Sequence, residues 1–144
     1  MKSCDTNILL YYLNRDCPEQ DAAARYLEAN WRRQDFALCE LVLLELYVLL
    51  RNPAVLSKPL RSATALNVIR QFRNHPHWAI IDYPGSLMDA VWKQAEAPDF
   101  PVRGIFDARL AYTLLHHGVR EFATRNTRHF QHFGFEKLVN PIDE

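Results

Sequence analysis

Cysteine is scarce in this sequence, and the three cysteines, Cys4, Cys17 and Cys39, show no paired metal-ligand spacing. An odd number at these positions argues against a disulfide framework and against a zinc site. Long hydrophobic runs are also missing, because the most apolar stretch, 41–50, is interrupted by Glu45 and is far shorter than the ~20 residues of a membrane span. The chain starts without the basic and apolar segments of a signal peptide. We therefore expect a cytoplasmic protein without a membrane segment.

Net charge is absent as well, because 17 basic and 17 acidic side chains cancel. This balance argues against a protein that coats nucleic acid non-specifically. The charges are nevertheless unevenly distributed: residues 51–78 contain five basic side chains and no acidic one, and residues 103–128 contain five arginines against two acids. Such segments are typical either of solvated helix faces or of a local contact with a polyanion.

Apolar periodicity predicts strands and helices in alternation. We expect strands at 2–4, 36–39, 78–82, 119–123 and 137–139, and helices starting near residues 6, 18, 40, 59, 85 and 107. This order implies an α/β fold in which helices cover both faces of a parallel sheet. No repeat, low-complexity segment or linker divides the chain, so we expect a single domain over 1–144.

Polar groups occur where strands end and helices begin. Asp5 follows the first strand, Asp107 opens the helix that Gly118 ends, and Asn126 closes the strand that follows this helix. Because the carboxyl ends of strands and the amino ends of the following helices meet in one crevice of an α/β sheet, these side chains are expected to share a site. The alternative for Asp5 is structural, since its carboxylate suits the N-cap of the following helix.

Glu45 is the anomaly of the sequence, because apolar residues precede and follow it on a helix predicted to be buried almost all round. Removing an ionised carboxylate from water costs several kcal/mol. A cation or several hydrogen-bond donors must offset this cost. Two interpretations follow: a structural salt bridge to an arginine, or a functional carboxylate that faces a cleft.

Three carboxylates without thiol or histidine companions suit a hard cation such as Mg²⁺ or Mn²⁺. A cation bound in this way activates water and neutralises charge on a phosphodiester. His129 and His132 are interpreted as loop residues rather than as metal ligands.

Four ordered motifs resemble those of PIN-domain nucleases, most of all the VapC toxins of bacterial toxin–antitoxin pairs. They cover nearly the whole chain and read DTNIL from Asp5, ELVLLELYVLLRNP around Glu45, IFDARLA around Asp107, and FATRNTRHF from Phe122, with the Thr-x-Asn signature at Thr124 and Asn126. The resemblance implies a three-layer α/β/α sandwich and a metal-dependent endoribonuclease that uses Mg²⁺ or Mn²⁺.

The same resemblance implies roles for individual residues. Asp5, Glu45, Asp107 and Asn126 stand at the catalytic, metal-binding positions, with Asn126 where many members have a fourth acid. Supporting roles fall to Thr124, which orients the site, and to Thr6 and Asn7. Candidate RNA contacts are Arg125 and Arg128. The resemblance also implies a homodimer and a VapB-like antitoxin whose carboxyl-terminal segment covers the cleft.

Two other functions fit parts of the pattern. A PIN-like module that binds RNA or protein without cutting is favoured by the amide at Asn126 alone. A phosphatase or phospho-receiver domain would need a second acid near Asp5 and a lysine after a late strand, where this chain has Asn7 and Thr124.

Overall fold

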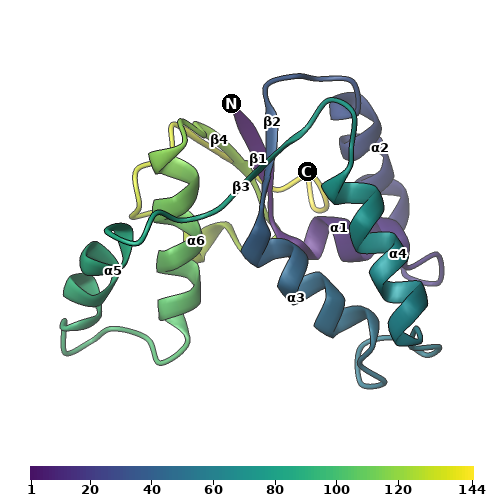
Figure 1. The fold of residues 1–144 in the computed structure, drawn as a ribbon, viewed down its shortest axis with the longest axis horizontal. Coiled ribbons are helices and arrows are strands. Elements are labelled where there is room, and N and C mark those ends of the chain that lie inside the picture. The colour runs from purple at the N-terminus through teal and green to yellow at the C-terminus, as the bar shows by residue number, and fades with distance from the viewer.

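A five-stranded parallel sheet forms the centre of the molecule in the computed structural model, which describes residues 1–144 (Figure 1). Its strands are β1 Lys2–Cys4, β2 Phe36–Cys39, β3 Ala79–Ile81, β4 Glu121–Ala123 and β5 Lys137–Val139. The order across the sheet is β3-β2-β1-β4-β5, and every neighbouring pair is parallel. The predicted parallel sheet is therefore confirmed.

Helices cover both faces of this sheet, as Figure 1 shows. On one side lie α1 Thr6–Leu13, α2 Gln20–Asn30, α3 Glu40–Leu50 and α4 Ser62–Arg73; on the other lie α5 Leu87–Ala95 and α6 Gly104–His116. A short 3₁₀ helix, η1 Thr127–His129, follows β4. The structure is the predicted three-layer α/β/α sandwich.

The predicted boundaries differ from the observed ones by up to about three residues, as is usual for the ends of helices and strands. The difference that matters is at α6, which begins at Gly104, so that Asp107 lies in its first turn rather than at its first position. Gly118 follows the end of this helix with a φ of 83°, a conformation that favours glycine. The chain then turns directly into β4.

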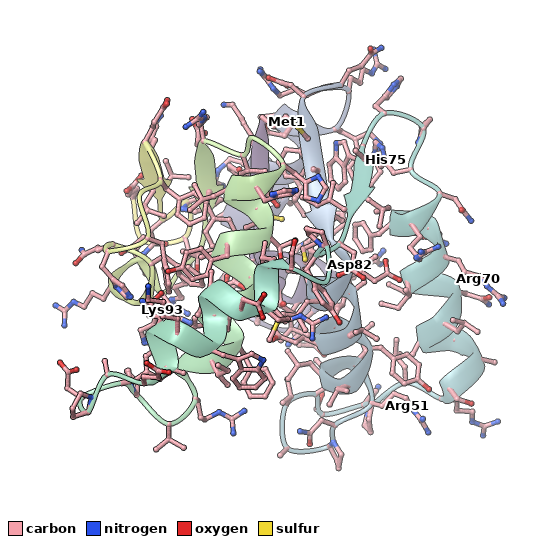
Figure 2. The ribbon with its side chains drawn as sticks, turned by 60° about the vertical axis from the view of Figure 1, so that its left-hand side comes forward. Met1, Arg51, Arg70, His75, Asp82 and Lys93 are labelled. Carbon is pink, nitrogen blue, oxygen red and sulfur yellow. The ribbon has the colours of Figure 1, made fainter.

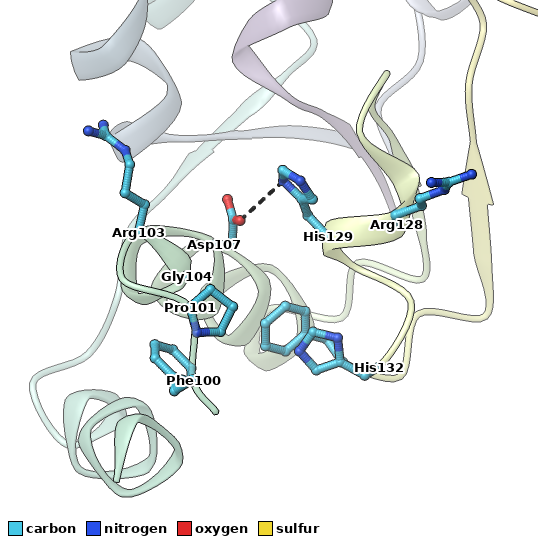
Figure 3. Close-up of a pocket in the computed structure, with 9 residues that line it drawn as sticks. Phe100, Pro101, Arg103, Gly104, Asp107, Arg128, His129 and His132 are labelled. Atoms are coloured by element: carbon cyan, nitrogen blue, oxygen red, sulfur yellow. Dashed lines mark ion pairs between the residues drawn. The ribbon is translucent and has the colours of Figure 1, made fainter. Parts of the chain in front are cut away.

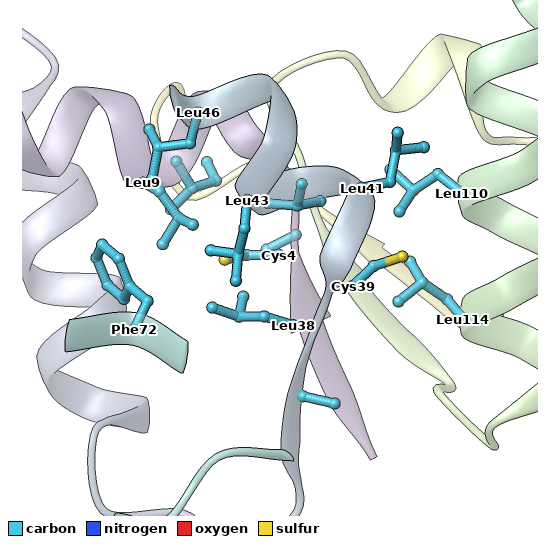
Figure 4. Packing of buried hydrophobic residues seen from close by; sticks show 14 of the residues in the cluster. Cys4, Leu9, Leu38, Cys39, Leu41, Leu43, Leu46, Phe72, Leu110 and Leu114 are labelled. Atoms are coloured by element: carbon cyan, nitrogen blue, oxygen red, sulfur yellow. The ribbon is translucent and has the colours of Figure 1, made fainter. Parts of the chain in front are cut away.

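The core fills the space between the sheet and both helix layers (Figure 4). Leu9, Leu43 and Leu46 pack above the sheet near Cys4, and the side chains of α6 pack near Cys39 on the opposite face. All three cysteines are free. Buried leucines from both layers thus fix α1, α3 and α6, the helices that carry the acidic residues, against the same strands.

Helix α3 is less buried than its sequence predicts. Leu44 and Val48 are 58% and 61% exposed, because α3 contacts β2, α1 and α4 with one side only and leaves an outer stripe toward the start of α6. Leu66 of α4 is likewise 39% exposed. No helix, α3 included, is both long and apolar enough to cross a membrane.

The acid-free segment 51–78 forms α4 and the loops around it (Figure 2). Part of its positive charge is used within the fold, since Arg73 binds Glu40 at 2.9 Å and Arg51 donates to the Tyr47 hydroxyl at 3.0 Å. Arg70 is exposed and extends outward from α4. The polyanion contact considered for this segment stays a prediction.

Candidate active site

The central strands β1 and β4 bring two distant segments together. The backbone N–H of Asp5, which follows β1, donates to the carbonyl of Ala123, the last residue of β4, at 2.8 Å. Chain connections leave these two strands toward opposite faces of the sheet. Ligands of open α/β sheets bind at such a switch point, outside the carboxyl ends of the strands. Asp5 and Thr124 therefore lie where a site is expected.

Asp5 is held by two hydrogen-bond donors and makes no ion pair with a cationic side chain. One carboxylate oxygen accepts from the backbone N–H of Thr6 at 2.8 Å, which is the predicted N-cap, and the other accepts from the Thr124 hydroxyl at 2.7 Å. The side chain is almost fully buried. Burial raises the pKa of Asp5, the two hydrogen bonds oppose this rise, and the nearby carboxyl of Asp107 adds to it. Asp5 is thus both a cap and a member of the site.

Glu45 reaches the same site from α3. Its carboxylate accepts from the Thr6 hydroxyl at 2.9 Å and makes no ion pair, so the salt-bridge interpretation has no partner in the structure. Partial burial raises the pKa of Glu45, and the negative charge of Asp5 raises it further, whereas Arg103 lowers it. Thr6, the first residue of α1, therefore links the two acids: its N–H binds one and its hydroxyl binds the other.

Asp107 faces His129 of η1, with the Nδ1 and Oδ2 atoms 3.5 Å apart (Figure 3). Burial raises the pKa of Asp107, His129 lowers it, and Glu45 raises it. The sequence interpretation placed His129 in a loop and did not pair it with Asp107. Its position three residues after Asn126, on the same short turn, was the signal that would have placed it here.

The three predicted acids are gathered at one place, whereas Asn126 lines a hollow that includes none of them. Each acid raises the pKa of another: Asp107 that of Asp5, Asp5 that of Glu45, and Glu45 that of Asp107. Asn126 is exposed, and its backbone N–H donates to the Thr124 hydroxyl at 3.0 Å. Its side chain lines a shallow hollow with Arg125, Thr127, Arg128, His129 and Asn140.

The donor chemistry of this site fits a hard cation. Burial raises the pKa values of the three carboxylates and repulsion between them adds to the rise, and a divalent cation that takes oxygen ligands relieves the repulsion. The acids are not arranged as a complete set of metal ligands, since no three His, Cys, Asp or Glu side chains converge closely enough to hold an ion. Threonine hydroxyls and His129 occupy the carboxylates instead.

The two candidate arginines differ in their surroundings. The guanidinium of Arg125 is engaged by Glu19 at 3.0 Å, by Asp143 at 3.3 Å and by the Tyr11 hydroxyl at 3.1 Å. These contacts join the carboxyl terminus to α1 and to the segment before α2. Arg128 is exposed, makes no ion pair, and points away from Asp107 in Figure 3. Only Arg128 has an uncommitted guanidinium.

Asn7 supports the Thr124 segment from α1. Its side-chain amide lies 3.5 Å from the Thr124 hydroxyl, and its carbonyl oxygen accepts from the backbone N–H of Arg125 at 3.4 Å. Both contacts cross from the segment after β1 to the segment after β4. Asn7 therefore helps to keep Thr124 beside Asp5.

Two hollows adjoin the acids. The first, here called the Asp107 pocket, is a cavity of about 290 Å³ (Figure 3) lined by Phe100, Pro101, Arg103, Gly104, Asp107, Arg128, His129, His132 and Phe133. The second, the α3–α6 groove, has a volume of about 400 Å³ and is lined by Leu41, Glu45, Val48, Leu49, Arg103 and Phe106. Arg103 borders both. The site thus opens toward a basic and aromatic pocket on one side and toward a mainly apolar groove on the other.

Comparisons with known proteins agree with this architecture. A PIN-domain family model matches residues 3–136. Ribonuclease VapC24 of Mycobacterium tuberculosis is 53% identical over 142 residues, which cover 99% of this chain and 97% of the relative. Among solved structures, VapC20 of Mycobacterium tuberculosis, described as a sarcin–ricin loop cleaving toxin, superposes with a TM-score of 0.66 at 16% identity over 85% of this chain and 87% of that one. VapBC2 of Rickettsia felis, solved with a promoter DNA fragment, gives 0.66 at 20% identity over 96% and 97%.

Proposed function

Because the chain belongs to the PIN-domain family, we propose that it is a metal-dependent endoribonuclease and the toxin of a toxin–antitoxin pair. The observation that carries the proposal is the gathering of three acids at the switch point of the sheet: Asp5 from the N-cap of α1, Glu45 from the middle of α3 and Asp107 from the first turn of α6. The relative that shares 53% of the sequence is named a ribonuclease, which supports RNA as the substrate.

In this proposal Asp5, Glu45 and Asp107 hold Mg²⁺ or Mn²⁺, and Asn126 adds an amide oxygen or orients water beside it. When bound, the cation lowers the pKa of a water molecule and neutralises the charge of the phosphodiester. The chain itself provides the orientation: Thr6 and Thr124 fix the carboxylates through short hydrogen bonds. Hydrolysis without a covalent intermediate leaves a 5′-phosphate and a 3′-hydroxyl.

Contact with the RNA backbone is assigned to Arg128, which is among the residues that line the Asp107 pocket and whose exposed guanidinium makes no ion pair and points away from Asp107 (Figure 3). Arg125 is assigned a supporting role, because its ion pairs to Glu19 and Asp143 leave it little capacity for a phosphate. Arginine in this position binds phosphate oxygens through paired N–H donors.

Cleavage of total cellular RNA by the purified protein tests the proposal. The wild-type chain is incubated with Mg²⁺, with Mn²⁺ and with EDTA, beside Asp107→Asn and the matched control Asp89→Asn, an exposed acid on α5. We expect discrete fragments that require metal, disappear in Asp107→Asn and persist in Asp89→Asn. Intact RNA in every lane, from folded protein free of antitoxin, would favour the non-cleaving module that the amide of Asn126 suggests.

A VapB-like antitoxin is the proposed partner, and the α3–α6 groove is its proposed contact. Structural neighbours include the VapBC2 complex, and the exposed Val48 and Phe106 offer an apolar surface next to Glu45. Val48→Glu is expected to weaken inhibition by a VapB-like antitoxin while RNA cleavage by the free protein persists. The homodimer implied by the family resemblance stays a proposal, which light scattering of the purified chain tests.

A further inference from the structure

We propose that the Asp107 pocket binds one nucleobase of the RNA, next to the phosphodiester that is cut, and that Phe100 and His132 are its specificity-determining side chains. The inference rests on the proposed ribonuclease function and adds to it a place for the base. Three features of the pocket carry it: its walls, its charge and its position relative to the acids.

The walls of the pocket offer flat aromatic surfaces. On one side the ring of Phe100 lies against the first turn of α6, so closely that a Cβ built at Gly104 would be 3.4 Å from its Cζ atom. On the other side the rings of His132 and Phe133 are 4.2 Å apart. Phe133 is itself supported by Tyr112, at 5.7 Å. Aromatic side chains in such positions stack with bases of any identity, at about 1–3 kcal/mol per base.

The size and charge of the pocket suit a nucleotide rather than a peptide side chain. Its volume of about 290 Å³ lies near the lower end of the roughly 300–1,000 Å³ typical of small-ligand sites. Arg103 and Arg128 are among the lining residues, with their guanidinium groups directed outward (Figure 3), and Asp107 is the only acid there. Positive charge at the rim of an aromatic cavity attracts a polyanion. The α3–α6 groove, by contrast, is largely aliphatic and suits a peptide.

The position of the pocket determines which nucleotide along the RNA it binds, namely the one next to the phosphodiester that is cut. Asp107 belongs both to the wall of the pocket and to the acidic cluster, and His129 is 3.5 Å from it (Figure 3). A base held between Phe100 and His132 therefore places its own phosphates beside the carboxylates. His132 is exposed at the edge of the pocket, where its ring nitrogens can hydrogen-bond to a base edge. Stacking then supplies affinity, and His132 supplies discrimination between bases.

The test uses a 12-nucleotide unstructured RNA that carries the fluorescent base 2-aminopurine at one position at a time, in EDTA so that the RNA stays intact. Stacking quenches this base, and we expect quenching at one position with the wild-type protein. Phe100→Ala should abolish the quenching and weaken binding about fivefold or more, the lower limit for the loss of one stacked base. Phe100→Tyr should restore both, and Trp92→Ala, an exposed aromatic on α5 outside the pocket, should change neither.

A second readout separates this proposal from the ribonuclease function. With Mg²⁺, cleavage of RNAs that differ in the base at the quenched position should show different kcat/KM values for the wild type, and His132→Ala should bring these values together. Two outcomes would overturn the pocket assignment and leave the nuclease function intact. In the first, the wild type cleaves RNA but quenches 2-aminopurine at no position; in the second, Phe100→Ala and His132→Ala both keep the base preference of the wild type. If Phe100→Ala and His132→Ala lose antitoxin binding but keep RNA binding, the nucleobase proposal is overturned and the Asp107 pocket is assigned to the antitoxin.

Discussion

Replacing Thr124 by valine tests how the acidic cluster is held. Thr124 is fully buried, and its hydroxyl donates to the Asp5 carboxylate at 2.7 Å. Valine keeps the shape of threonine and removes the donor, so Asp5 loses one of its two hydrogen bonds. The expected effect is therefore on the ionised form of Asp5.

The magnitude follows from the charge on the acceptor. A hydrogen bond to a charged group contributes about 1.5–3 kcal/mol to stability, against about 0.5–1.5 kcal/mol for a neutral one. At ~2.1 cal/mol/K per residue, a chain of 144 residues has an unfolding entropy of about 0.3 kcal/mol/K. The melting temperature of Thr124→Val should then fall by about 5–10 °C at neutral pH.

Acid should reduce this loss. The hydrogen bond from Thr124 lowers the pKa of Asp5 against the rise caused by burial, so the valine variant raises the folded-state pKa further. The difference between the two proteins is fully present at a pH above the raised pKa values, and it decreases as the pH falls through them toward the ordinary value of 3.8. Part of the loss persists in acid, because the Asn126 N–H also loses its acceptor.

Thr113→Val is the matched control. Thr113 is equally buried, and its hydroxyl donates at 2.7 Å to the carbonyl of Arg109, a neutral acceptor within α6. Thermal unfolding followed by circular dichroism, for both variants and the wild type from neutral to acid pH, measures the two losses. Equal losses in the two variants, or a Thr124→Val loss that is independent of pH, would refute the assignment of an ionised, hydroxyl-held Asp5.

Three further outcomes are expected. Glu45→Gln should abolish RNA cleavage yet leave the melting temperature at neutral pH unchanged or higher, because it removes a half-buried charge that has no cationic partner. A large drop in melting temperature would instead give Glu45 a structural role. Mg²⁺ at a hundred times its Kd should stabilise the wild type by about 2.7 kcal/mol, seen as a rise of the melting temperature, and should stabilise Asp107→Asn less. Arg128→Gln should weaken RNA binding and reduce its salt dependence at an unchanged melting temperature, whereas Arg125→Gln should lower the melting temperature and keep the salt dependence.

Much of the fold was predictable from the sequence, because it depends on local patterns. Short apolar strands, N-cap residues such as Asp5 and the stop at Gly118 each act within a few residues, and their alternation selects a parallel sheet. The sequence also indicated that Asp5, Glu45 and Asp107 belong together, because each is a carboxylate at an unusual position. For the strands, the helix ends and the three acids, local chemistry and sheet topology thus lead to the same prediction.

The remaining features depend on contacts that no local pattern contains. Leu44 and Val48 have the apolar character of core residues, and only the packing of α3 against one side of the molecule exposes them. His129 was interpreted as a loop residue because the distance from η1 to α6 is set by tertiary structure. Arg125 and Arg128 are equivalent in sequence, and only the return of the carboxyl terminus distinguishes them, by placing Asp143 beside Arg125.

The way in which the acids are held costs stability and is consistent with the proposed metal site. A structural carboxylate cluster in a protein interior is expected to have arginine or lysine partners, because uncompensated buried charge is costly. Here Asp5 and Glu45 receive only threonine and backbone donors, and burial, together with the smaller effect of mutual repulsion, raises the pKa values of all three acids. Ionisation of the three acids therefore lowers stability as the pH rises through these values, and a cation reverses that effect. In the proposed function, the free energy lost in the folded chain would become affinity for the metal.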